Sequence, residues 1–130
     1  MTIYTTYFAK VKDLPKDITP ISICGKAPDG WTGLQCKHLA PKWTFFQEWK
    51  KNGDNNYYIE HFQKEVLDTQ DAYHIYCELL AMSPTEKIAL VCYEKPTDFC
   101  HRHLVAQWLS NSLCMEIKEY EFVENAQTLG

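Results

Sequence analysis

Three residues with chemically useful side chains stand next to one another at Cys100, His101 and Arg102. A thiol can act as a nucleophile or metal ligand, an imidazole can move a proton, and a guanidinium can bind an anion. Glu94 lies shortly before them and offers a carboxylate that pairs with Arg102 or orients His101. We therefore expect His101, Cys100 and Glu94 to be the catalytic candidates, with Arg102 as a ligand-binding cation.

The position of this cluster between a strand and a helix predicts an anion site. Residues 88–93 are nearly all apolar, which is typical of a central strand buried on both faces. Thr97 or Asp98 can cap the helix that follows, so that residues 100–102 fall in its first turn. Backbone N–H groups and the helix dipole favour an anion there, and they lower the pKa of Cys100. The expected ligand is a phosphate-bearing molecule, either a nucleotide or a nucleic-acid end.

The same residues allow other interpretations. Cys92 is a small hydrophobic core residue or, together with Cys100 and His101, a metal ligand. Cys100 also fits inert packing. Arg102 paired with Glu94 fits a structural clasp in a non-catalytic binding or regulatory module.

A second loop, at residues 24–33, is rich in glycine and would end at the same edge of a parallel sheet. Ser22, Lys26 and Trp31 lie in or beside it, and they are the further ligand-binding candidates. The glycine spacing matches neither a dinucleotide-binding nor a Walker fingerprint. The loop alone therefore does not identify a phosphate site.

These loops need a sheet to position them. Aromatic, β-branched or apolar runs predict strands at residues 3–9, 20–24, 88–93 and 114–123. Helical periodicity predicts helices at residues 41–52, 58–67, 69–82 and 103–112. Strands separated by helices predict an α/β fold, with a small, mainly parallel sheet of about four strands flanked by helices on both faces.

Length and charge narrow the class of protein. The chain has 130 residues, enough for a single α/β domain over residues 1–130 with a short flexible tail from about residue 125. The net charge of −4 argues against a broad nucleic-acid surface. No apolar run is long enough for a membrane span, and we see no export signal, so we expect a cytoplasmic protein.

The six cysteines are expected to be free thiols or ligands, because cytoplasmic thiols stay reduced. None of them forms a Cys-x-x-Cys pair, the usual structural zinc spacing. No cofactor, resident metal or oligomeric state follows from the sequence.

The sequence resembles the domain family of unknown function 488, in its short form from bacteria and their phages. The resemblance covers about residues 20–119, and it rests on the segments 22–33, 39–41, 43–50, 57–67, 90–95 and 99–105. Within 23–25, many relatives place arginine or serine where this chain has Ile, Cys and Gly. The resemblance implies a three-layer, Rossmann-like domain without a settled biochemical role. Its motif falls on Glu94, Cys100, His101 and Arg102.

Overall fold

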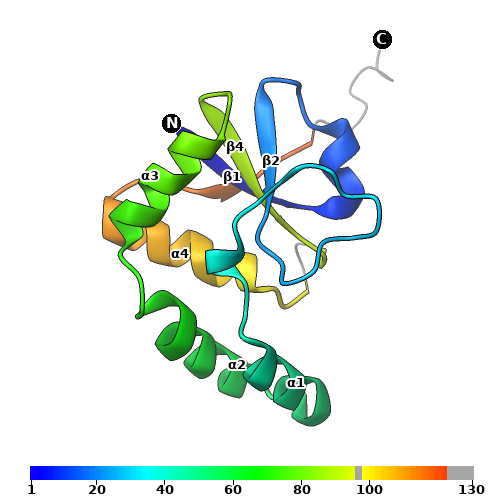
Figure 1. Ribbon diagram of the computed structural model, residues 1–130, viewed down its shortest axis with the longest axis vertical. Helices are drawn as coiled ribbons and strands as arrows, with labels where there is room; N and C mark the ends of the chain where they lie inside the picture. The colour runs from blue at the N-terminus through cyan, green and yellow to red at the C-terminus, as the bar shows by residue number, and fades with distance from the viewer. Residues whose placement is uncertain (96–97, 123–130) are drawn as a thin grey trace.

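The computed structural model describes residues 1–95 and 98–122 of the chain (Figure 1). Five strands form one sheet in the order β3-β2-β4-β1-β5, and every pair of neighbours is parallel. The strands are β1 (Thr2–Tyr7), β2 (Ile18–Ser22), β3 (Leu34–Gln35), β4 (Lys87–Cys92) and β5 (Lys118–Glu119). The predicted α/β class and parallel sheet are confirmed.

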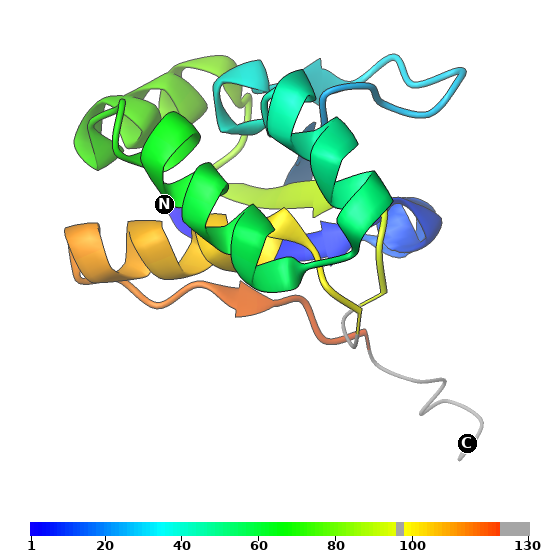
Figure 2. The same ribbon diagram turned by 90° about the horizontal axis from the view of Figure 1, so that it is seen from below.

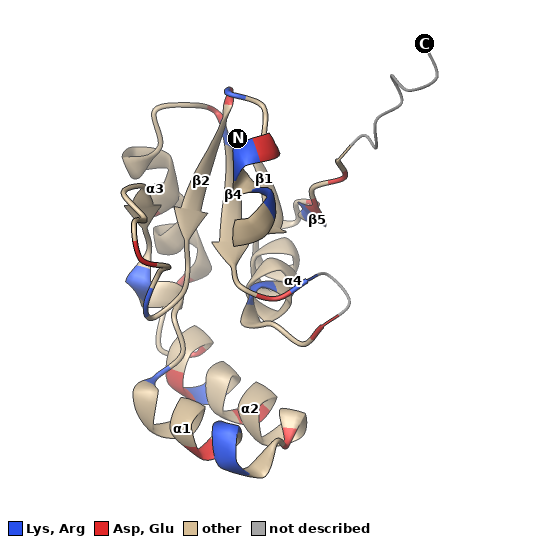
Figure 3. Ribbon diagram, turned by 90° about the vertical axis from the view of Figure 1, so that its right-hand side faces the viewer, with Lys and Arg blue, Asp and Glu red and all other residues tan. Residues whose placement is uncertain are grey.

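The sheet and the helices on its two faces form three layers. The helices are η1 (Phe8–Asp13), η2 (Lys37–Leu39), α1 (Trp43–Asn52), α2 (Asn55–Phe62), η3 (Gln63–Leu67), α3 (Ala72–Met82) and α4 (His101–Leu113). Helices α3 and α4 lie on one face of the sheet, and the short 3-10 helix η1 lies on the other (Figures 1 and 3). None of the helices in the described part of the chain has the length and apolar character needed to cross a bilayer.

Helices α1 and α2 form a hairpin beyond the carboxyl ends of β2 and β4 (Figure 3), and Figure 2 shows this pair from below. Gly53 ends α1 with a positive φ of 65°, which glycine adopts without a Cβ penalty. Asp54 then caps α2 by accepting hydrogen bonds from the backbone N–H groups of Asn56 and Tyr57. Both basic and acidic residues lie on this hairpin (Figure 3). Because it lies beyond the carboxyl ends of β2 and β4, the hairpin faces the edge of the sheet where ligands usually bind in α/β folds.

Strand β4 occupies the centre of the sheet, between β1 and β2. Ile88 pairs with Ile3 on one side and with Thr19 on the other. Every residue of β4 after Lys87 is buried, as expected for a strand that is covered on both faces. This strand fixes the position of Cys92 at its carboxyl end.

The structure corrects several predicted boundaries. Strand β3 was not predicted, and only Lys118–Glu119 of the predicted last strand is a strand. Cys114, where that strand was expected to start, instead ends α4 in the left-handed conformation with φ 53°. Residue 123 and the predicted tail lie outside the described residues.

The start of α4 also differs from the prediction. Cys100 is the N-cap residue, and the helix begins at His101. Among the described residues no side chain caps it, so capping by Asp98 was wrong, and Thr97 lies outside the described residues. Cys100 therefore lies at the entrance of the helix rather than inside its first turn.

Candidate functional site

A cavity of about 480 Å³ lies at the carboxyl edge of the sheet. Its floor is formed by the segments that follow β2 and β4, its outer wall by α1, and one side by the start of α4. Cavities of this size commonly hold a small molecule, and this edge is where α/β sheets bind their ligands. The cavity brings together Lys26, Glu94, Cys100 and His101, four of the residues singled out from the sequence.

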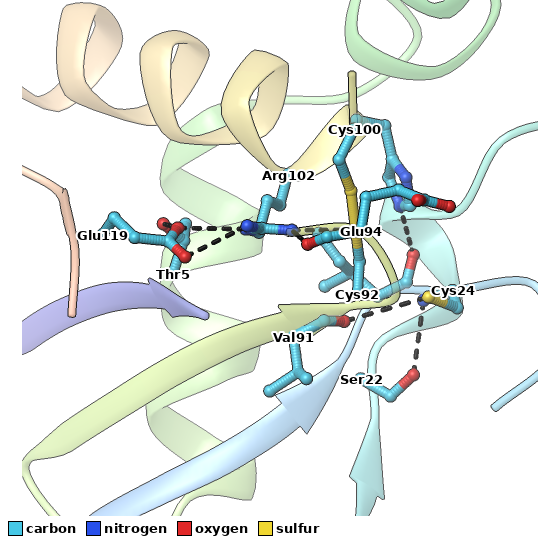
Figure 4. The surroundings of a disulfide bond; sticks show 11 residues. Thr5, Ser22, Cys24, Val91, Cys92, Glu94, Cys100, Arg102 and Glu119 are labelled. Carbon is cyan, nitrogen blue, oxygen red and sulfur yellow. Dashed lines mark hydrogen bonds and ion pairs between the residues drawn. A yellow bond between two sulfur atoms is a disulfide. The ribbon is translucent and has the colours of Figure 1, made fainter. Parts of the chain in front are cut away.

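Cys92 and Cys100 are joined by a disulfide bond in the cavity wall (Figure 4). The bond connects the end of β4 with the N-cap of α4. The expectation that all six cysteines are free thiols or ligands was therefore wrong for this pair. Nothing in the local spacing predicts it, because the pairing depends on how β4 and α4 are packed. Cys24, Cys36, Cys77 and Cys114 are free.

His101 is buried beside the disulfide, and its ring is held by the backbone of the first loop. Its Nε2 lies 2.7 Å from the carbonyl oxygen of Ile23. A carbonyl only accepts hydrogen bonds, so Nε2 carries the proton and Nδ1 keeps its lone pair. Burial lowers the pKa of His101 to about 4, so the ring is neutral at pH 7. The imidazole is therefore fixed in one tautomer.

Arg102 has no exposed surface, and its carboxylate partner is Glu119 (Figure 4). Its Nε donates to Glu119 Oε1 and its Nη2 to Glu119 Oε2, each at 3.0 Å. Thr5 Oγ1 donates to the same Oε1 at 2.6 Å. The predicted pairing with the Glu94 carboxylate was wrong: Arg102 Nη1 donates to the backbone oxygen of Glu94, at 2.6 Å, and the residue itself is exposed. Arg102 thus ties α4 to β5 and to the loop after β4, and Glu119 is in turn bonded to β1 through Thr5.

The remaining predicted ligand-binding residues lie apart from the cavity lining. Ser22 is fully buried, and its Oγ accepts a hydrogen bond from the backbone N–H of Cys24. The Trp31 ring packs on Phe8, and its Nε1 donates to the carbonyl oxygen of Leu34. The cavity therefore brings Lys26 to the catalytic candidates but leaves Ser22, Trp31 and Arg102 outside.

An aromatic wall on α1 was missed as part of the site. The wall consists of Trp43, Phe46 and Trp49, and the last two also pack on the core. Trp43 is 69% exposed, and all three residues line the cavity together with Lys50. Their spacing on one helix face, ending in a lysine, is the signal that could have identified them.

The two loops that form the floor are connected to each other. The hydroxyl of Tyr93 donates to the backbone oxygen of Lys26 at 2.7 Å.

Cys24 also lines the cavity, and burial raises the pKa of its thiol to about 11. Across the cavity, burial raises the pKa of Tyr58 well above its usual range. These two groups are therefore neutral at pH 7.

In the described part of the chain, one group of side chains could hold a metal ion once the Cys92–Cys100 disulfide is reduced. The sulfur atoms of Cys92 and Cys100 and one ring nitrogen of His101 lie within 4.8 Å of one another. Two sulfurs and one imidazole nitrogen form a donor set that is typical of zinc.

Fold and site together define a parallel α/β domain with a ligand-sized cavity and a cysteine–histidine cluster at its carboxyl edge. A family model described as the active DUF488-N3 subclade, DUF488-N3a, matches residues 6–113. The chain therefore belongs to the DUF488 family, as its sequence motif indicated. Comparison with curated proteins and with solved structures finds no significant match.

Proposed function

We propose that this protein is an enzyme-like domain that binds a small phosphate-bearing ligand, of the nucleotide class, in the cavity at the carboxyl edge of the sheet. The observation that carries the proposal is the composition of that cavity. An aromatic wall faces it from α1, and two lysines and a cysteine–histidine cluster line the same space. A planar ring with an attached anion is the ligand that such a lining complements.

The aromatic wall on α1 would stack on the ring of the ligand. Trp43 and Phe46 are stacked, with ring centroids 6.5 Å apart and an angle of 27° between the planes. Trp43 is exposed, so one face of its indole remains free to stack on a base or a similar ring. Stacking on an aromatic side chain contributes about 1–3 kcal/mol per base in nucleic-acid-binding proteins.

Two lysines would bind the anionic part of the ligand. Lys26 and Lys50 line the cavity, one from the first loop and one from α1. Their role replaces the one expected for Arg102, whose guanidinium is bound to Glu119. The start of α4 also lies at the cavity, and no side chain of the described residues caps it, so its backbone N–H groups are suited to an anion.

The catalytic candidates keep their proposed roles. Neutral His101 has a lone pair on Nδ1 and would accept a proton from a bound ligand or water. Cys100 would act as a nucleophile only after the disulfide is reduced. Glu94 is an exposed residue in the cavity lining, and its carboxylate would orient the ligand. We also propose a cytoplasmic location, where reduction would open the Cys92–Cys100 bond.

A second candidate function is a non-catalytic binding or regulatory module. The burial of Arg102 and its two bonds to Glu119 favour a structural clasp for this residue. In that case the cavity binds its ligand without turnover. Ligand binding would then be intact in His101→Asn and Glu94→Gln, while no substrate would be converted by the unmodified protein.

Equilibrium binding followed by tryptophan fluorescence tests the ligand proposal, because Trp43 and Trp49 line the cavity. Nucleoside monophosphates are compared with the matching nucleosides and with inorganic phosphate. We expect the monophosphates to bind most tightly, and we expect Lys50→Ala to weaken them by about tenfold, the loss of one charge-assisted hydrogen bond. Lys51→Ala is the matched control, because Lys51 is exposed on the same helix outside the cavity lining.

Two results would contradict the proposal. Equal affinity for nucleosides and monophosphates would show that no anion site exists. Equal effects of Lys50→Ala and Lys51→Ala would place any binding outside the cavity.

A further inference from the structure

We propose that the reduced form of this protein binds one zinc ion through Cys92, Cys100 and His101, with a fourth position open to the cavity. In the oxidised form the disulfide joins the two sulfur atoms, and a ring nitrogen of His101 lies within 4.8 Å of both, although the residues come from the end of β4 and the start of α4. Zinc would occupy the Cys100 sulfur and the His101 Nδ1, so the zinc-bound form excludes the nucleophile and base roles proposed above for these two atoms. The test measures metal and not nucleotide, so the zinc proposal and the ligand proposal can fail separately.

The histidine has the arrangement of a metal-bound imidazole. Metal-bound histidines usually donate their second ring N–H to a carbonyl or carboxylate, which fixes the ring and its tautomer. In this protein Nε2 donates to the backbone oxygen of Ile23 at 2.7 Å. The lone pair therefore resides on Nδ1, which is the ring nitrogen left to bind a metal.

Both sulfur atoms lie where a thiolate is stabilised. Cys100 is the N-cap of α4, where the helix dipole favours negative charge. The Nη1 of Arg102 lies 3.5 Å from the sulfur of Cys92 and donates toward it. Two thiolates neutralise the charge of Zn²⁺, and Arg102 is already neutralised by Glu119. The buried cluster would thus carry no net charge, which avoids the cost of burying an unpaired ion.

The backbone positions also fit a shared ion. The Cα atoms of Cys92 and Cys100 are 7.3 Å apart. This separation exceeds the usual range for a disulfide and suits two thiolates on one tetrahedral ion. All three ligand residues line the cavity, so water or a ligand can reach the fourth position. Three protein ligands and one open position are typical of catalytic rather than structural zinc.

The oxidised and reduced forms are linked by a balanced reaction. A phosphine reductant takes up oxygen from water and becomes a phosphine oxide. The disulfide accepts the two electrons, its S–S bond breaks, and the two protons of the water go to the sulfur atoms. Zn²⁺ then displaces both protons as the two Zn–S bonds form. The disulfide form lacks both thiolates and cannot bind zinc in this way.

The experiment compares oxidised and phosphine-reduced protein, purified without a histidine tag, in a zinc titration against a chromophoric chelator. We expect one zinc ion per reduced chain and none at this site in the oxidised chain, with both forms folded by circular dichroism. Cobalt should give the visible bands of a tetrahedral site with sulfur ligands. A reduced, folded protein that binds no zinc would overturn the proposal.

Variants locate the site. Cys92→Ser and Cys100→Ser should each weaken zinc binding by more than the roughly 10–100-fold that is typical of outer-shell changes. Cys77→Ser is the matched control, because Cys77 is a free thiol on α3 outside the cavity lining. Zinc binding that is lost in Cys77→Ser, or retained in Cys100→Ser, would overturn the assignment. Nucleotide binding to the zinc-free oxidised protein is measured separately, so the two proposals can fail independently.

Discussion

Arg102 and Glu119 form a two-bond ion pair that joins the start of α4 to β5, with both donor–acceptor distances at 3.0 Å. The guanidinium has no exposed surface, whereas the Glu119 side chain keeps 24% of its own. Thr5 on β1 donates to the same carboxylate. The pair therefore connects three elements and holds the segment that carries Cys100 and His101.

Removing either partner of this pair should destabilise the fold. We expect Arg102→Met or Glu119→Gln to lower the free energy of unfolding by about 3–5 kcal/mol, because each leaves the other charge, fully or largely buried, without its partner. The double variant should cost less than the sum of the two single changes. Urea unfolding measures all three. The control is Glu116→Gln, which removes only an exposed ion pair with Lys118 and should cost about 1 kcal/mol or less. An Arg102→Met effect as small as this control would contradict the clasp.

Because of Cys36, the free energy of unfolding should decrease as the pH rises into the alkaline range. Burial and a hydrogen bond to Glu78 raise the pKa of the Cys36 thiol to about 12, from an ordinary value of 9.0. Between these values the unfolded chain loses the proton while the folded chain keeps it, so this contribution to stability is complete below pH 9 and falls as the pH rises. The loss between about pH 8 and pH 10 should be about 1–2 kcal/mol.

Urea unfolding of the unmodified chain and of Cys36→Ala at both pH values measures this loss. The variant should be less stable at the lower pH but should show the smaller decrease at the higher pH. Cys24 also has a raised pKa and is present in both proteins, so its effect cancels in the comparison. Equal decreases in the two proteins would contradict the prediction.

The free thiols should differ in their rates of alkylation. Cys114 is exposed, whereas Cys24 and Cys36 are buried with raised pKa values, so little thiolate is available at these two positions. Under non-reducing conditions, iodoacetamide should modify Cys114 first, as followed by mass spectrometry of the peptides. Cys114→Ser should abolish the fast phase. Modification of Cys24 at the same rate as Cys114 would mean that the floor of the cavity is open to solvent.

The sequence predicts the elements whose pattern is local. The continuous apolar run at residues 88–93 identifies β4, and the helical periodicity at residues 41–52 identifies α1. Strand β3 has only two residues and exists through pairing with Ile21 and Ser22, so no periodicity can reveal it. The same holds for the end of the chain, where only Lys118–Glu119 pairs with β1.

In the candidate site, too, the sequence predicts what lies within one segment and misses contacts between separate segments. Adjacent residues identify the turn at Cys100 and His101, and the cavity does lie there. The partner of Arg102 is distant in sequence, and a nearby carboxylate at Glu94 was the natural but wrong expectation. The disulfide likewise depends on the packing of α4 against the sheet and not on cysteine spacing. Contacts between distant segments are what sequence patterns do not encode.

The common direction of the five strands also determines where a probe can be attached to this protein. Because β1 runs parallel to β4, Met1 lies at the amino edge of the sheet and the cavity at the carboxyl edge. One strand length, about 20 Å, separates the two. A fluorophore or a surface anchor at Met1 would leave the entrance to the cavity unobstructed, so immobilised protein should bind its ligands as the protein in solution does.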